Sequence, residues 1–208
     1  MLEGPAGSLD ALLQEDAGRE PRLAALICHP HPRYGGTMHN KVVHRCATVL
    51  HGLGAAVLRF NFRGAGRSEG TFDRGAGELE DARAAFGWLR ARHPRARLWV
   101  AGFSFGSWIA ARLAAAEPAV GRLVLIAPPV GASGFGFLKS VAVPKLVVQG
   151  TRDDVCPLAA LEAEFPAWAE PKTLVRIEGA THFFDRRLRD LGAALTAALA
   201  GAARDASA

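Results

Sequence analysis

The stretch VAGFSFGS, residues 100–107, decides the fold. An apolar run precedes it, a helix-period segment follows it, and Gly102, Ser104 and Gly106 form a G-x-S-x-G motif at the junction. In such a tight turn from strand to helix, flanking glycines let the backbone pass, and the serine hydroxyl is pushed out above the edge of the sheet. The motif therefore predicts that Ser104 is a nucleophile. A turn of small residues without chemistry is the alternative.

Outward from this turn, apolar runs alternate with helix-period segments along the chain. We expect strands at residues 23–29, 55–62, 97–102, 122–128, 145–150 and 173–179. We expect helices at about residues 37–51, 77–92, 105–117, 157–168 and 184–200. The strand segments are continuously apolar, as strands covered on both faces are. This order predicts an α/β fold with a mostly parallel sheet and helices on both faces.

The length of the chain indicates one domain over residues 1–208. We expect a short hairpin over about residues 1–16 and a frayed tail over about residues 202–208. No signal peptide is visible, and the uncharged stretch 191–203 is shorter than the roughly 20 residues of a bilayer span. We therefore expect a cytoplasmic protein without a membrane partner.

Charge and cysteine content argue against two classes of protein: those that bind nucleic acids, and those built on disulfides or a zinc ribbon. The formal net charge is +5, and the densest basic cluster, RRLR at residues 186–189, has no accompanying row of aromatic residues, so no nucleic-acid partner is expected. The three cysteines form no C-x-x-C pair and are odd in number, which indicates neither a disulfide framework nor a zinc ribbon. Nothing in the sequence indicates an oligomeric state.

A nucleophilic serine needs a base, and the base needs an orienting acid. Asp153 and Asp154 come just after the apolar run at residues 145–150, and His182 comes just after the next one. An aspartate after a strand is often only a helix cap, and a single histidine is often a surface residue. The order serine, aspartate, histidine at three strand ends is nevertheless that of an α/β-hydrolase triad.

The chain resembles the α/β-hydrolase superfamily, and most closely a small lidless bacterial branch related to the dienelactone hydrolases. The resemblance covers nearly the whole chain and is carried by GPAG (4–7), HPHPRYGGTMHNKVVH (29–44), RFNFRGAGRSEG (59–70), GFSFGS (102–107), QGTRDDVCP (149–157) and GATHFF (179–184). It implies an α/β-hydrolase fold without a lid domain. Only a short segment separates the apolar runs at 122–128 and 145–150, where many relatives insert a lid.

The resemblance also implies roles for particular residues. In this family the acid follows a strand in the pattern G-x-x-D-x-x-[VC]-P, which Gly150, Asp153, Cys156 and Pro157 match, so that Asp153 is the expected acid and Asp154 the alternative. Dienelactone hydrolases carry a cysteine at the elbow. Ser104 at that position favours ester hydrolysis by a serine.

The segment CHPHPRYGGTMHN, residues 28–40, holds three histidines and allows three interpretations. The first is a metal site around His29 and His31. Zinc needs three or four ligands, and no further histidine is obviously close, so we expect no metal and no cofactor. In the second, the loop helps to form the oxyanion hole. The family places a backbone donor after this strand, which corresponds to the N–H of His31, with Tyr34 as the alternative. In the third, the histidines only form hydrogen bonds with neighbouring loops.

The other donor of the oxyanion hole is expected from the helix that follows the nucleophile. The backbone N–H of Phe105 lies directly after Ser104, where the positive end of the helix dipole also points. The glycine-rich segment FRGAGRSEG, residues 62–70, does not match a phosphate-binding loop, and we interpret it as structural support beside the site. Without a lid, the substrate pocket is expected to be walled by Tyr34, Phe135, Phe137 and Phe183.

The sequence therefore predicts a serine carboxylesterase-like hydrolase. Its expected partner is a small or short-chain carboxylic ester, hydrolysed through an acyl-enzyme on Ser104 with His182 as base and Asp153 as acid. A non-catalytic binding protein of the same fold is the first alternative. A metal-dependent hydrolase that uses His29 and His31 is the second.

Overall fold

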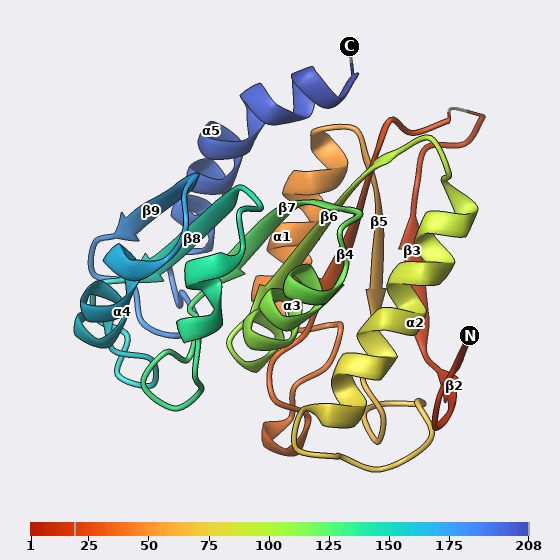
Figure 1. Ribbon diagram of the computed structural model, residues 1–208, viewed down its shortest axis with the longest axis horizontal. Coiled ribbons are helices and arrows are strands. Elements are labelled where there is room, and N and C mark those ends of the chain that lie inside the picture. The colour runs from red at the N-terminus through yellow and green to blue at the C-terminus, as the bar shows by residue number, and fades with distance from the viewer. Residues whose placement is uncertain (19, 208) are drawn as a thin grey trace.

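The computed structural model describes residues 1–18 and 20–207, and in this part of the chain seven strands form one sheet (Figure 1). Their order across the sheet is β3 (Ala11–Gln14), β5 (Ala55–Phe60), β4 (Leu23–Cys28), β6 (Arg97–Phe103), β7 (Val120–Ile126), β8 (Lys145–Gly150) and β9 (Lys172–Ile177). Only the edge pair β3–β5 is antiparallel among these neighbours. The expected mostly parallel sheet is confirmed.

Alternate residues of the central strands are buried on opposite faces of this sheet. In β4, Ala24, Leu26 and Cys28 face one apolar core, and Leu23, Ala25 and Ile27 face the other. The first core is completed by α2 (Ala76–Arg92), α3 (Phe105–Ala116) and the short α4 (Leu158–Glu164). The second is completed by α1 (Lys41–Gly52) and α5 (Leu188–Ser207) (Figure 1). Helices thus cover both faces, and the predicted fold class is confirmed.

The ends of several elements differ from the expected ranges. Helix α1 begins at Lys41 rather than near residue 37, because Asn40 caps it by accepting a hydrogen bond from the Val42 N–H at 2.9 Å. Helix α4 is shorter than expected, since a 3-10 turn with Pro166 at its centre, Phe165–Ala167, replaces its last part. These differences move no strand out of the sheet.

The structure differs most from the expectations at the two ends of the chain. The N-terminal hairpin is formed by β1 (Leu2–Gly4) and β2 (Gly7–Leu9), whereas β3 joins the main sheet beside β5. The tail that was expected to fray is helical, because α5 continues to Ser207 and buries Ala203 and Ala206 against the second core. Residue 208 lies outside the described residues. No described helix is both long and apolar enough to span a bilayer.

Loops that follow the carboxyl ends of three strands carry the candidate catalytic residues. Ser104 follows β6, Asp153 follows β8, and His182 follows β9. Because parallel strands all end at the same edge of a sheet, these residues come together there. The connection between β7 and β8 contains, as its only described helical element, the 3-10 turn Gly136–Ser140, so no lid domain is inserted.

Candidate functional site

The turn that carries Ser104 depends on its two glycines. A Cβ atom on Gly102 would overlap the carbonyl oxygen of Gly106, and one on Gly106 would overlap the carbonyl oxygens of Cys28 and His29. Ser104 itself has φ 53° and ψ −124°, a strained conformation that costs about 1–3 kcal/mol. Its N–H donates to the carbonyl oxygen of Ile126 at 2.9 Å, which anchors the turn to β7. The predicted strand–turn–helix context of the motif is confirmed.

A chain of hydrogen bonds joins the three residues that the sequence predicted. His182 Nε2 lies 3.1 Å from Ser104 Oγ, and His182 Nδ1 lies 2.9 Å from Asp153 Oδ2. The side chains of His182 and Asp153 are 5% and 0% exposed, so little water competes for these bonds. The imidazole also packs against the ring of Phe103, with centroids 5.0 Å apart. This geometry satisfies the requirement that base and nucleophile lie within hydrogen-bond reach.

Backbone and side-chain donors hold the carboxylate of Asp153. Oδ1 accepts hydrogen bonds from the N–H groups of Val155 and Cys156, at 3.0 and 2.7 Å. Oδ2 accepts one from Gln149 Nε2 at 3.0 Å in addition to its bond with His182. The neighbouring Asp154 is exposed. The structure therefore brings Asp153, and not Asp154, against the histidine.

Gln149 is a residue of the site that sequence reasoning missed. Its Nε2 bridges the carboxylate of Asp153 and the carbonyl oxygen of Cys156, the latter at 2.7 Å. The side chain is fully buried at the end of β8. The available signal was a single amide in the otherwise apolar run LVVQG, directly before Gly150. A buried amide must find hydrogen-bond partners, and here it positions the acid.

One set of three potential metal ligands occurs at this site: the ligand atoms of Asp153, Cys156 and His182 lie within 4.8 Å of one another. Burial raises the pKa of the Cys156 thiol to about 12, and the charge of Asp153 acts in the same direction. The thiol is therefore protonated at neutral pH, whereas a metal needs the thiolate. Asp153 and His182 are also bonded to each other. Asp153 and His182 therefore fit a hydrogen-bonded triad with Ser104 better than a metal centre with Cys156.

His29 has a structural role that uses both ring nitrogens. The side chain is fully buried, Nδ1 donates to the carbonyl oxygen of Pro30 at 2.6 Å, and Nε2 accepts from the Phe62 N–H at 3.0 Å. Burial lowers the pKa of His29 to about 4, so the imidazole is neutral. Neither nitrogen is free to bind a metal. This argues against the metal site that the H-x-H sequence suggested.

His31 is packed differently and lines the cavity beside Ser104. Its Nδ1 accepts a hydrogen bond from the Arg33 N–H at 3.2 Å, and its ring contacts those of Tyr34, Phe72 and Phe105 at centroid distances of 4.7 to 4.9 Å. Partial burial lowers its pKa. In the described part of the chain no acceptor takes up the His31 backbone N–H. Its role, and that of the Phe105 N–H, as oxyanion donors stay predictions.

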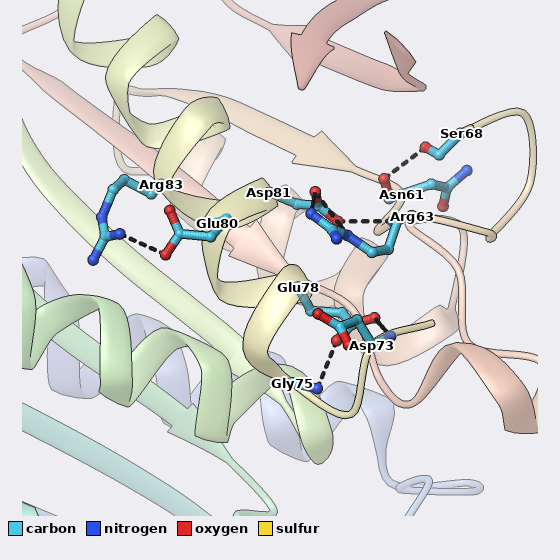
Figure 2. A network of polar contacts seen from close by, with 9 residues as sticks. All are labelled: Asn61, Arg63, Ser68, Asp73, Gly75, Glu78, Glu80, Asp81 and Arg83. Atoms are coloured by element: carbon cyan, nitrogen blue, oxygen red, sulfur yellow. Dashed lines mark hydrogen bonds and ion pairs between the residues drawn. The ribbon is translucent and has the colours of Figure 1, made fainter. Parts of the chain in front are cut away.

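Two buried carboxylates of α2 hold the glycine-rich segment 62–70 and the residues that lead from it to this helix (Figure 2). Asp81 pairs with the guanidinium of Arg63, with Nη2–Oδ1 at 2.7 Å, and also accepts from the Arg63 N–H at 2.9 Å. Glu78 accepts hydrogen bonds from the N–H groups of Asp73 and Gly75 at 2.8 and 2.6 Å. Because Phe72 lies between Arg63 and Asp73 in the chain and packs on His31, the network holds one wall of the site in place.

The cavity beside the triad has a volume of about 180 Å³. Tyr34 and Phe183 line it, as expected, together with Val155, and these three side chains are exposed at its rim. Phe135 and Phe137 do not line it, which corrects the sequence expectation. Phe135 is fully buried and stacks on Trp168 at 5.6 Å, and Phe137 stacks on Phe135, because the β7–β8 connection folds back toward the 3-10 turn after α4.

A hydrolase family model described as serine aminopeptidase, S33, matches residues 19–135. An α/β serine hydrolase homologue from Coxiella burnetii has a TM-score of 0.91 and 41% sequence identity, and the alignment covers 95% of each chain. A lidless α/β serine hydrolase from Xanthomonas campestris has a TM-score of 0.88 and 41% identity, over 95% of this chain and 91% of that one.

A further relative is similar over most of its length. An uncharacterized protein of Rickettsia prowazekii is 34% identical over 203 residues, which covers 93% of this chain and 85% of that protein. The protein Est1E from Butyrivibrio proteoclasticus, in a structure with ferulic acid bound, has a TM-score of 0.81 at 20% identity over 92% of this chain and 94% of that one, and it shares the fold.

Proposed function

The chain belongs to the α/β-hydrolase family described as serine aminopeptidase, S33, and we propose that it hydrolyses small carboxylic esters through Ser104, His182 and Asp153. The observation that carries this proposal is the unbroken hydrogen-bond chain from Ser104 Oγ through both nitrogens of His182 to Asp153. The two similar solved structures named as serine hydrolases support it at the level of the family.

The proposed reaction has two steps. In the first, His182 Nε2 takes the proton of the Ser104 hydroxyl while Oγ attacks the ester carbonyl, and the same nitrogen then protonates the departing alcohol. In the second, His182 takes a proton from water, which attacks the acyl-enzyme, and the acid leaves as Ser104 regains its proton. Asp153 holds the imidazole in the tautomer that presents a free Nε2. The N–H groups of Phe105 and His31 are the proposed donors to the oxyanion.

The lining of the cavity favours an ester over a peptide substrate. An aminopeptidase must bind the positively charged N-terminus of its substrate, and a carboxylate is the group that does this well. No carboxylate is among the described residues that line the cavity, whereas Val155, Tyr34 and Phe183 give it an apolar rim. Its volume of about 180 Å³ suits a short acyl chain.

The experiment that tests this proposal is covalent labelling of the purified protein with a fluorophosphonate, followed by peptide mass mapping. We expect the label on Ser104, and we expect hydrolysis of p-nitrophenyl acetate and butyrate but not of amino-acid p-nitroanilides. Ser104→Ala should abolish both labelling and hydrolysis while the circular dichroism spectrum is unchanged. Ser140→Ala, at an exposed serine of the β7–β8 connection, is the matched control and should leave both intact.

Two outcomes would contradict the proposal. If Ser104→Ala hydrolyses the esters as fast as the wild type, the nucleophile is wrong. If the folded wild type neither reacts with the fluorophosphonate nor hydrolyses any ester, the alternative of a non-catalytic binding protein is favoured.

A further inference from the structure

A second cavity lies at the edge of the sheet opposite Ser104. Its volume is about 460 Å³, and its lining residues come from the beginnings of β6 and β7 and the ends of α2 and α5. Figure 1 shows where these elements begin and end. Arg97 is the first residue of β6, and Ser104 directly follows the last one. At about 3.3 Å per residue, the seven residues of this strand separate the two cavities by roughly 23 Å. The second cavity therefore does not belong to the catalytic site.

Three arginines from three different elements line this cavity. Arg90 comes from the last turn of α2, Arg97 from the start of β6, and Arg122 from β7. Within the described residues, none of their guanidinium groups has a hydrogen bond or an ion pair. By contrast, seven other arginines of the chain pair with carboxylates: Arg63, Arg67, Arg83, Arg92, Arg95, Arg176 and Arg187.

Arg122 is the most constrained of the three. Its guanidinium stacks over the indole of Trp99, with 5.3 Å to the ring centroid, and the side chain is partly withdrawn from water. This burial lowers the pKa of Arg122, while the charge of Asp205 acts in the opposite direction. A half-buried guanidinium without a hydrogen-bonding acceptor has lost part of its hydration, and an anion in the cavity would supply the missing hydrogen bonds.

We propose that this cavity binds a small anion with phosphoryl groups, such as a pyrophosphate or a phosphorylated small molecule. Guanidinium groups bind phosphate oxygens with two parallel hydrogen bonds, which suits three arginines that converge from different elements. Asp205 is the only carboxylate among the described lining residues, so the cavity has an excess of positive charge. Its volume exceeds that of a single phosphate. The indole of Trp99 is 3% exposed and covered by Arg122, which leaves no aromatic face for a nucleobase.

Isothermal titration calorimetry with inorganic pyrophosphate tests this site directly, without any readout of ester hydrolysis. The titration is done at constant ionic strength, with sodium chloride as the compensating salt. We expect saturable binding at one site per chain. Arg122→Gln and Arg97→Gln should each weaken binding roughly tenfold or more, because each removes a charge-assisted pair of hydrogen bonds.

The matched control is Arg189→Gln, which removes the same charge from an exposed position at the start of α5, far along the helix from Asp205. It should bind pyrophosphate like the wild type, and thermal melts should show that all three variants remain folded. Equal weakening by Arg189→Gln and Arg122→Gln would mean a general charge effect and would overturn the proposal, as would the absence of saturable heat.

Two further arms distinguish the source of the anion. Co-sedimentation with phosphatidylcholine vesicles that contain phosphatidic acid tests a lipid headgroup, and titration with a short duplex DNA tests a nucleic acid. We expect free pyrophosphate to bind. Any binding of the vesicles or the DNA should be equally strong for Arg122→Gln and for the wild type. Binding of vesicles or DNA that depends on Arg122, without binding of free pyrophosphate, would overturn a small-molecule site.

Discussion

The N–H of Phe62 donates a hydrogen bond of 3.0 Å to Nε2 of the buried His29. This bond joins the loop after β5 to the loop after β4, and the second loop carries His31 to the cavity beside Ser104. His29 also donates to the carbonyl oxygen of Pro30, so one neutral ring satisfies two backbone groups that water does not reach. The position of the proposed oxyanion loop therefore depends on a histidine that takes no part in the chemistry.

Replacing His29 by alanine should destabilise the protein by about 2–4 kcal/mol, because it leaves the Phe62 N–H and the Pro30 carbonyl without partners and creates a cavity. The measurement is the free energy of unfolding in urea. His39→Ala is the control, since His39 is exposed on the same loop, and its effect should stay within about 0.5 kcal/mol. Equal effects of the two changes would show that His29 is not a structural bridge.

The lowered pKa of the same residue, His29, should make the stability of the protein depend on pH. The pKa of His29 is lowered from 6.5 to about 4 in the folded protein, so between these values the unfolded chain binds a proton that the folded one does not. The stabilising contribution is present above pH 6.5 and is lost as the pH falls toward 4. Between pH 7 and pH 5 the free energy of unfolding should fall by roughly 2 kcal/mol for this reason.

Urea unfolding of the wild type and of His29→Gln at both pH values measures this contribution. Glutamine does not titrate, so the variant should lose less stability than the wild type between pH 7 and pH 5. An identical loss in both proteins would assign the pH dependence to other groups.

Asp153→Asn should lower kcat for p-nitrophenyl acetate by roughly 10⁴-fold, because an amide favours the wrong tautomer of the catalytic imidazole. Asp154→Asn should change kcat little, since Asp154 is exposed and it is the carboxylate of Asp153 that bonds to His182. Steady-state kinetics of the two variants, which differ by one position in the chain, provide the comparison. A greater loss in Asp154→Asn would reverse the assignment of the acid.

Gly106→Ala should impair both folding and activity. The new methyl group would overlap the carbonyl oxygens of Cys28 and His29, and backbone atoms have little room to move away. We expect lower stability and, in any folded fraction, a lower kcat, because the loop after β4 must shift. Gly201→Ala in α5 is the control. No atom lies within 4 Å of its added Cβ, so this change should be neutral or stabilising by up to about 1 kcal/mol.

The sheet, its helices and the serine elbow could be predicted because each depends on a local pattern. Continuous apolar runs indicate strands covered on both faces, and the G-x-S-x-G motif has a steric reason that the contacts of Gly102 and Gly106 now show. The meeting of Ser104, Asp153 and His182 in space could also be predicted, since each follows a strand and parallel strands end at one edge of the sheet.

Long-range packing explains what the sequence could not indicate. Phe135 looked like a pocket residue, but its ring fills a gap against Trp168, which lies far along the chain. Gln149 was missed because its partners, Asp153 and Cys156, come together only when β8 and its following loop fold. The length of α5 was underestimated because Ala203 and Ala206 are small, and only their burial against the second core extends the helix.

The short connection between β7 and β8 has a kinetic consequence. Because this connection inserts no lid domain, the proposed ester substrate would reach Ser104 by diffusion, without waiting for a lid to open. Water would have the same direct access to the proposed acyl-enzyme. We therefore expect turnover to be limited by acyl transfer rather than by a conformational gate, and an oil–water interface to give no activation.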